Sequence, residues 1–248
     1  MVVCAAAVTG IVAFGPLAAD AGTEDAVGRQ RTLLGRSVDG SAITVLESGD
    51  FDSPRKMLIV GCIHGNECAG IAIAARLAAV PAPPETDLWI LADLNPDGAA
   101  AHTRGNAHGV DLNRNFPWHW MRLTGMYASG PGPLSEPESR IAVRLMKFVR
   151  PTVSIWFHQH LNVVDDSSGN LQLERRFATT ADMRLERLTR EPGSVVTWES
   201  HCLSRGSAFV VELPSGSLST RAAGRFTNAV ASTALAAPES RPRLADCR

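Results

Sequence analysis

Short apolar runs that alternate with helix-like segments constrain the fold of this chain more than any other feature. Residues 57–63, 87–94 and 153–157 have the length of strands and are dominated by apolar side chains. Continuous apolar runs of this kind are typical of strands that are buried on both faces, as in parallel sheets. Helices are expected at 67–80 and 135–149. The alternation predicts an α/β sandwich with a central, mostly parallel sheet.

The rest of the chain fits the same single domain. Residues 22–56 are expected to form a short hairpin and a loop, and residues 99–135 show no clear period. Two more strands are expected at 195–198 and 209–213, followed by a last helix at 219–236. The sequence shows no internal repeat and no low-complexity segment, so residues 22–248 are expected to form one domain.

Composition and charge exclude several classes of protein. The 24 Lys and Arg residues nearly balance the 25 Asp and Glu residues, giving a formal net charge of −1. This balance excludes a strongly basic protein that binds nucleic acid by neutralising phosphates. With 45% hydrophobic and 20% charged residues the chain is far from the composition of disordered proteins. After residue 30 no segment approaches the ~20 apolar residues of a membrane span, so no stable membrane association is expected.

Residues 1–21 differ from the rest of the chain. Residues 2–17 are almost uninterruptedly apolar, and Ala19-Asp20-Ala21 matches the A-x-A pattern of a signal-peptidase site. No basic residue precedes the apolar run, so the true start of the signal is expected upstream of Met1. A membrane anchor or a frayed apolar terminus is the alternative. The segment predicts export to the cell envelope or the extracellular space.

Four cysteines follow this segment: Cys62, Cys68, Cys202 and Cys247. They form no C-x-x-C pair, which argues against a thiolate zinc site or a thioredoxin-like redox site. Export would allow a disulfide, and Cys202–Cys247 is the first candidate pair. The alternative is that all four are reduced and act as small apolar side chains.

Polar side chains that can bind a metal occur where the apolar strands end. His64 and Glu67 follow the first strand, and their spacing of three lets both face one side of a helix start. His158 follows the third strand, while Glu212 lies inside an apolar run, where an unpaired carboxylate would cost several kcal/mol. The carboxyl ends of strands form the usual ligand crevice of an open α/β sheet. Two His and one Glu can hold a catalytic Zn²⁺, and a further carboxylate can take a proton from water.

Competing interpretations exist for these residues. His160 could share a face with His158 in an extended chain and so compete as the third ligand. His158 could also be a hydrogen-bonded core histidine without a metal. The nucleophile pattern G-x-S-x-G, the phosphate-binding loop G-x-x-x-x-G-K-[ST] and the zinc motif H-E-x-x-H are all absent from the sequence.

The chain resembles the zinc carboxypeptidase family, and within it the bacterial murein-peptide amidase branch. The similar segments are His64-Gly65-Asn66-Glu67, Asn95-Pro96-Asp97-Gly98, Arg104-Gly105-Asn106, Gly109-Val110-Asp111-Leu112-Asn113-Arg114-Asn115-Phe116-Pro117, Ser135-Glu136-Pro137-Glu138, His158-Gln159 and Glu212-Leu213. The resemblance implies a single-domain α/β/α sandwich with a mixed, mostly parallel sheet. It also implies one Zn²⁺ per chain, held by His64, Glu67 and His158.

The resemblance implies roles for four further residues. Glu212 is similar to the general base that activates water, and Arg104 is similar to the arginine that steadies the oxyanion. Asn113 and Arg114 resemble the pair that binds the terminal carboxylate of the substrate, a task that suits the two-pronged donor geometry of arginine. The alternative for this pair is a loop held by its own carbonyl groups.

One departure from the family pattern concerns a mobile tyrosine that closes over the substrate in the digestive enzymes. The single tyrosine of this chain, Tyr127, lies elsewhere in the sequence. Either Glu212 and zinc suffice, or Glu199, His201 or Arg205 assists.

These residues predict a zinc metallocarboxypeptidase that hydrolyses an amide bond near the carboxyl end of a short peptide. The murein branch suggests cell-wall peptides that contain diaminopimelate. A zinc-dependent deacylase of N-acyl aspartate or glutamate is the nearest alternative, because it shares the H-G-N-E and D-L-N-R strings. Residues 95–98 and 135–138, together with the apparent export signal, favour the peptidase. A catalytically silent carboxylate-binding protein on the same fold is a third hypothesis.

Overall fold

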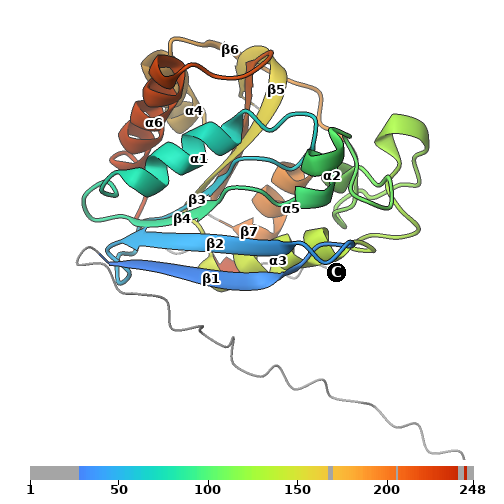
Figure 1. Ribbon diagram of the computed structural model, residues 1–248. Helices are drawn as coiled ribbons and strands as arrows, with labels where there is room; N and C mark the ends of the chain where they lie inside the picture. The colour runs from blue at the N-terminus through green and yellow to red at the C-terminus, as the bar shows by residue number, and fades with distance from the viewer. Residues whose placement is uncertain (1–27, 167–169, 205, 240–242, 245–248) are drawn as a thin grey trace, which may run out of the picture.

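The computed structural model describes residues 28–166, 170–204, 206–239 and 243–244, and a seven-stranded sheet forms its centre (Figure 1). The strands of this sheet are β1 (Arg29–Arg36), β2 (Ala42–Gly49), β3 (Lys56–Val60), β4 (Asp87–Leu91), β5 (Val153–Asp165), β6 (Arg184–Glu186) and β8 (Ser207–Pro214). Their order is β1-β2-β4-β3-β5-β6, and β8 also pairs with β5. The β3–β4, β3–β5, β5–β6 and β5–β8 pairs are parallel, whereas β1–β2 and β2–β4 are antiparallel. This confirms the predicted mixed, mostly parallel sheet.

Helices cover both faces of the sheet. One face carries α1 (Gly70–Ala79), α4 (Leu171–Ala181) and α6 (Thr220–Ala234), and the other carries α3 (Pro137–Val149) and α5 (Val195–Cys202) (Figure 1). The short helix α2 (Pro96–Ala101) and the 3-10 turns η1 (Leu112–Arg114) and η2 (Gly125–Tyr127) lie in the long connection before α3. A separate pair of short strands is formed by β7 (Leu203–Ser204) and β9 (Arg243–Leu244).

Two apolar cores follow from the pleat of the sheet. Ile59 and Ile155 pack with α1, α4 and α6, whereas Leu58 and Trp156 pack with α3 and α5. Successive side chains of a strand point to opposite faces, so a continuous apolar strand supplies both cores at once. Burial of each such side chain contributes roughly 1.5–3 kcal/mol.

The connection from β3 to α1 is unusually close to its neighbours. A Cβ atom at Gly70 would lie 2.3 Å from the carbonyl oxygen of Gly61 and 2.6 Å from Cβ of Phe157. Only glycine permits this approach. It allows the segment between β3 and α1 to cross directly beside β5 at Phe157.

The structure corrects the prediction of a strand at 195–198. These residues begin α5, and the side chain of Ser194 caps the helix by accepting a hydrogen bond from the backbone N–H of Thr197. A short apolar run does not distinguish a buried strand from a buried helix, and packing against β8 decides between them. In addition, β5 continues to Asp165 instead of ending at residue 157.

Two predictions concern residues outside the described part of the chain. Residues 1–21, expected to form the export signal, are among them, and so is Cys247. The export signal and the Cys202–Cys247 pair therefore stay predictions. Among the described helices, none combines the length and the apolar character that crossing a bilayer requires.

Candidate active site

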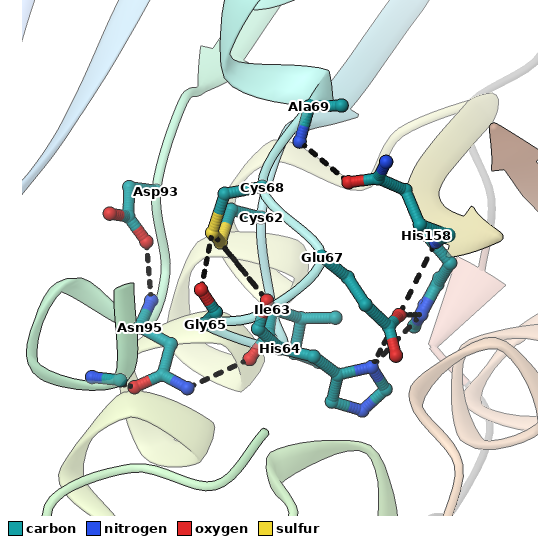
Figure 2. The surroundings of a disulfide bond; sticks show 12 residues. Cys62, Ile63, His64, Gly65, Glu67, Cys68, Ala69, Asp93, Asn95 and His158 are labelled. Atoms are coloured by element: carbon teal, nitrogen blue, oxygen red, sulfur yellow. Dashed lines mark hydrogen bonds and ion pairs between the residues drawn. A yellow bond between two sulfur atoms is a disulfide. The ribbon is translucent and has the colours of Figure 1, made fainter. Parts of the chain in front are cut away.

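Two imidazoles and one carboxylate converge where β3 ends and where β5 continues beyond its pairing with β3. The Nδ1 atom of His64 lies 2.9 Å from Oε2 of Glu67. The Nδ1 atom of His158 lies 3.2 Å from each of these two atoms. Both histidines are buried, and Figure 2 shows the three side chains turned toward one another. The predicted ligand set is thus brought together from two distant segments.

This donor set fits zinc. A tetrahedral ion with bonds of about 2.0–2.1 Å places its ligand atoms roughly 3.3 Å apart. The three observed separations, 2.9, 3.2 and 3.2 Å, are close to that spacing. Two imidazoles and one carboxylate also match the composition of catalytic zinc sites, which keep a fourth position for water.

Asp111 and Arg104 hydrogen-bond to two of the candidate metal ligands. The Nε2 atom of His64 lies 2.9 Å from Oδ1 of Asp111, which leaves the Nδ1 lone pair of His64 for the metal. Arg104 donates from Nε to Oδ2 of Asp111 at 2.8 Å and from Nη1 to Oε1 of Glu67 at 2.7 Å. Asp111 lies within a segment that resembled the family, yet sequence reasoning assigned it no role. The sequence spacing between His64 and Asp111 does not predict their contact, because the two residues are brought together only by the tertiary fold.

The charges of this cluster hold its carboxylates ionised. Burial by itself would raise the pKa of Asp111, but His64 and Arg104 outweigh it and lower that pKa to about 2. Burial would likewise raise the pKa of Glu67, but the contacts of its carboxylate with the imidazoles of His158 and His64 outweigh burial and bring that pKa well below the usual range. Both groups are therefore negative at neutral pH, which suits Glu67 as a metal ligand and Asp111 as the hydrogen-bond partner that orients the ring of His64.

Glu212 stands beside the third ligand because of the sheet register. Residues His158 and Glu212 are direct partners in the parallel β5–β8 pair. Register partners on neighbouring strands point to the same face, so Glu212 faces the same pocket as His158. Its Oε2 atom is buried and has no hydrogen-bond partner among the described residues. Glu212 thus lines the pocket with a carboxylate oxygen that keeps its capacity to accept a hydrogen bond.

One pocket of about 420 Å³ is lined by all the residues predicted as metal ligands, as the base and as substrate-binding groups. These residues are His64, Glu67, Arg104, Asn113, Arg114, His158 and Glu212. His160 also lines this pocket, but its side chain is exposed and it is not part of the three-ligand cluster. The prediction of His158 over His160 therefore agrees with the geometry.

Asn113 and Arg114 are held on η1 at the pocket wall. Asn113 accepts a hydrogen bond through Oδ1 from the backbone N–H of Val195, at 2.9 Å. Arg114 donates from Nη1 to the carbonyl of Asn113, and its Nη2 lies 3.5 Å from Glu191. The Nε atom of Arg114 is buried without a hydrogen-bond partner among the described residues. The loop is thus partly held by its own carbonyl, while the guanidinium keeps a donor for an anionic ligand.

Tyr127 lines the pocket despite its different place in the sequence. The centre of its ring lies 5.3 Å from Cζ of Arg104 and 5.3 Å from Cζ of Arg114. Such cation–π contacts hold a guanidinium in place without using its hydrogen-bond donors. Sequence reasoning missed this residue, because the family tyrosine comes from another part of the chain.

The residues suggested as substitutes for that tyrosine lie elsewhere. Glu199 is buried under the sheet, where it accepts hydrogen bonds from Oγ of Ser154 and from Nε1 of Trp156. His201 stacks on Trp118. Neither lines the pocket, and Arg205 is outside the described residues.

Glu199 gives a testable dependence of stability on pH. Burial raises its pKa from 4.5 to about 7, against the opposing effect of its two hydrogen bonds. The unfolded chain therefore loses the proton first, so this residue lowers the free energy of unfolding as pH rises from 4.5 to about 7. Glu199→Gln mimics the neutral acid and should remove up to about 3 kcal/mol of this fall. The free energy of unfolding of both proteins is measured in urea at pH 5 and at pH 8. An equal fall in this free energy between the two pH values for wild type and Glu199→Gln would contradict the prediction.

The comparisons with known proteins agree with this geometry. The family described as zinc carboxypeptidase matches residues 82–165. Murein peptide amidase A of Vibrio campbellii is 30% identical over 204 residues, which cover 74% of this chain and 79% of the relative.

Two solved structures share the fold. The murein-tripeptide amidase of Escherichia coli O157 superposes with a TM-score of 0.68 at 24% identity, covering 82% of this chain and 91% of that one. A succinylglutamate desuccinylase from a Silicibacter species superposes with a TM-score of 0.62 at 16% identity, covering 92% and 71%. The fold is therefore shared by peptidases and deacylases, whereas the sequence match points to the peptide amidases. The match to murein peptide amidase A agrees with the converging zinc-type ligands, and the chain belongs to the zinc carboxypeptidase family of peptide-hydrolysing enzymes.

Proposed function

We propose that this protein is an exported zinc amidase that removes the carboxyl-terminal residue from short cell-wall peptides. One observation carries the proposal. The three metal ligands, the base beside them and the carboxylate-binding pair all face a single pocket. We infer one Zn²⁺ per chain, held by His64, Glu67 and His158.

The residues of the pocket divide the reaction between them. When bound, the zinc ion supplies Lewis acidity to the attacking water and to the scissile carbonyl. Glu212 accepts the proton of that water and then gives it to the leaving nitrogen. Arg104 carries a fixed positive charge where negative charge develops on the carbonyl oxygen. Asn113 and Arg114 hold the terminal carboxylate, which sets the distance of the scissile bond from the metal.

The charges at the pocket wall support a leaving residue that carries both signs. Asp165 and Glu191 line the pocket together with Arg114 and Arg190. As the terminal residue of a peptide, diaminopimelate presents two carboxylates and one free ammonium group, because its other amine forms the scissile amide. A pocket wall of mixed charge suits such a residue better than it suits an apolar one. The names of the relatives point the same way.

The disulfide between Cys62 and Cys68 supports export. Disulfides persist in oxidising compartments and are rare in the reducing cytosol. The A-x-A pattern at 19–21 supports the same proposal.

A substrate panel tests the proposed function. The purified protein is incubated with a tripeptide ending in diaminopimelate, with ordinary peptides, and with N-acyl aspartate and glutamate, each with and without a chelator. Mass spectrometry should show release of free diaminopimelate, abolished by the chelator. Preferred cleavage of the N-acyl amino acids would establish the deacylase instead. No turnover by a zinc-loaded protein would leave a silent carboxylate-binding protein.

Arg114→Ala should weaken the binding of this substrate. Removing one partner of a buried charged pair typically costs 2–5 kcal/mol, so KM should rise by about 30-fold or more. Arg221→Ala, an exposed position on α6, is the control and should leave KM unchanged. An unchanged KM for Arg114→Ala would remove Arg114 from the carboxylate site.

A further inference from the structure

The disulfide of this chain encloses the metal-binding segment. Cys62 and Cys68 are bonded across a sequence separation of 6. His64 and Glu67 both lie inside this ring, so two of the three proposed ligands belong to one covalently closed loop. Figure 2 shows the sulfur atoms on one side of the loop and the two ligand side chains on the other.

The sulfur atoms contact the loop that they close. The Sγ atom of Cys62 lies 3.4 Å from the carbonyl oxygen of His64, and Sγ of Cys68 lies 3.5 Å from that oxygen and 3.4 Å from the carbonyl oxygen of Gly65. In the bonded state neither sulfur carries a proton, so these are packing contacts. The bond therefore fills the inner side of the turn and supports the backbone from which His64 extends.

Secondary structure alone does not hold this segment. β3 ends at Val60 and α1 begins at Gly70. Between them the backbone N–H of Glu67 donates to the carbonyl of His64, and the carbonyls of Cys62 and Cys68 accept from the backbone N–H groups of Leu94 and Ile71. Two side chains fix its outer edges: Asn95 donates to the carbonyl of Ile63 at 3.1 Å, and Gln159 accepts from the backbone N–H of Ala69 at 3.0 Å. Among the described residues, the disulfide is the one covalent cross-link within this segment.

We propose that the Cys62–Cys68 disulfide positions the metal ligands. The bond holds His64 and Glu67 in their ligand arrangement before the ion binds. This inference rests on the proposed zinc site. A closed ring of this size has far fewer backbone conformations than an open loop, so less conformational entropy is lost when the metal orders it. The oxidation state of the two sulfurs therefore sets the affinity of the site for zinc.

Reduction of the bond is a balanced two-electron step. A water-soluble trialkylphosphine attacks one sulfur and breaks the S–S bond. Water then converts the phosphine to its oxide and supplies the protons of the two thiols. A phosphine is preferred to a dithiol reagent, because thiolates are themselves zinc ligands.

Zinc affinity, measured without substrate by competition with a chromophoric chelator, tests this inference. Reduction of the wild-type protein should weaken zinc binding about 10- to 100-fold, the range found when groups that orient metal ligands are removed. Cys62→Ala, Cys68→Ala and the double variant should all lose the same factor, because each removes the same bond. Circular dichroism of the metal-free proteins verifies that each variant is folded.

The double variant is also the matched control for the reagent. Its zinc affinity should not respond to phosphine, whereas a response would show that reduction acts elsewhere in the chain. Equal zinc affinity of the oxidised wild type and the folded double variant would overturn the positioning role. The two single variants could instead lose zinc affinity by different factors, with the double variant losing the product of the two. That result would assign the effect to side-chain packing and would also overturn the positioning role. A wild-type protein that binds no zinc would instead contradict the proposed function.

Discussion

Replacing Glu212 by glutamine should abolish turnover while the protein keeps its zinc. The amide has nearly the size of the carboxylate but cannot accept a proton from water. Loss of a positioned general base typically costs a factor of about 10² to 10⁴ in rate. Zinc binding should be unchanged, because the three atoms that converge on one point belong to His64, Glu67 and His158.

The measurement combines kcat on the diaminopimelate tripeptide with zinc content by elemental mass spectrometry. Glu186→Gln, an exposed carboxylate at the end of β6 that does not line the pocket, is the matched control and should behave as wild type. A Glu212→Gln protein with near-normal kcat would exclude Glu212 as the base. Loss of zinc in the same variant would show that Glu212 is a ligand, a role that the geometry does not give it.

His158→Ala should release the metal, whereas His160→Ala should retain it. The Nδ1 atom of His158 lies 3.2 Å from the corresponding atom of His64 and from the carboxylate of Glu67. Removing it leaves two of three protein ligands, so the loss of zinc affinity should exceed the 10- to 100-fold typical of supporting residues. The side chain of His160 is exposed and outside this triangle.

Both variants are dialysed against a chelator and their zinc content is then measured. This pair of substitutions is well matched, because the two residues are of the same type and two positions apart on one strand. Retention of zinc by His158→Ala together with its loss in His160→Ala would reverse the ligand assignment. Retention by both would require a metal site elsewhere in the chain.

Much of the fold could be predicted because the strands next to the site are apolar on both faces. Such runs, as at 57–60 and 153–157, have one stable environment, the middle of a sheet covered by helices. The run at 195–198 shows the limit of this argument. Its composition suits a strand, yet the Ser194 cap and packing on β8 make it the start of α5.

For the site, too, the sequence predicted one part and tertiary contacts decided the rest. His64, Glu67 and His158 could be identified because polar residues that directly follow apolar runs of parallel strands meet at one edge of the sheet. Asp111 and Tyr127 could not be identified as site residues, because both lie on a long loop. The path of this loop depends on contacts between residues distant in sequence. The Cys62–Cys68 bond was also missed. Cysteine spacing alone does not reveal pairing, and the tight turn that brings the sulfurs together is a property of the folded loop.

The amino-acid sequence by itself determined the kinds of elements, their order along the chain and the chemical types of the residues that follow the apolar runs. These features depend on local periodicity and on the burial preference of each residue. The tertiary structure decided which of those ends meet. It set Glu212 beside His158 through strand register, placed Asp111 behind His64 and laid Tyr127 over two arginines. These contacts join residues far apart in the chain, and their geometry depends on how whole elements pack, which no local pattern encodes.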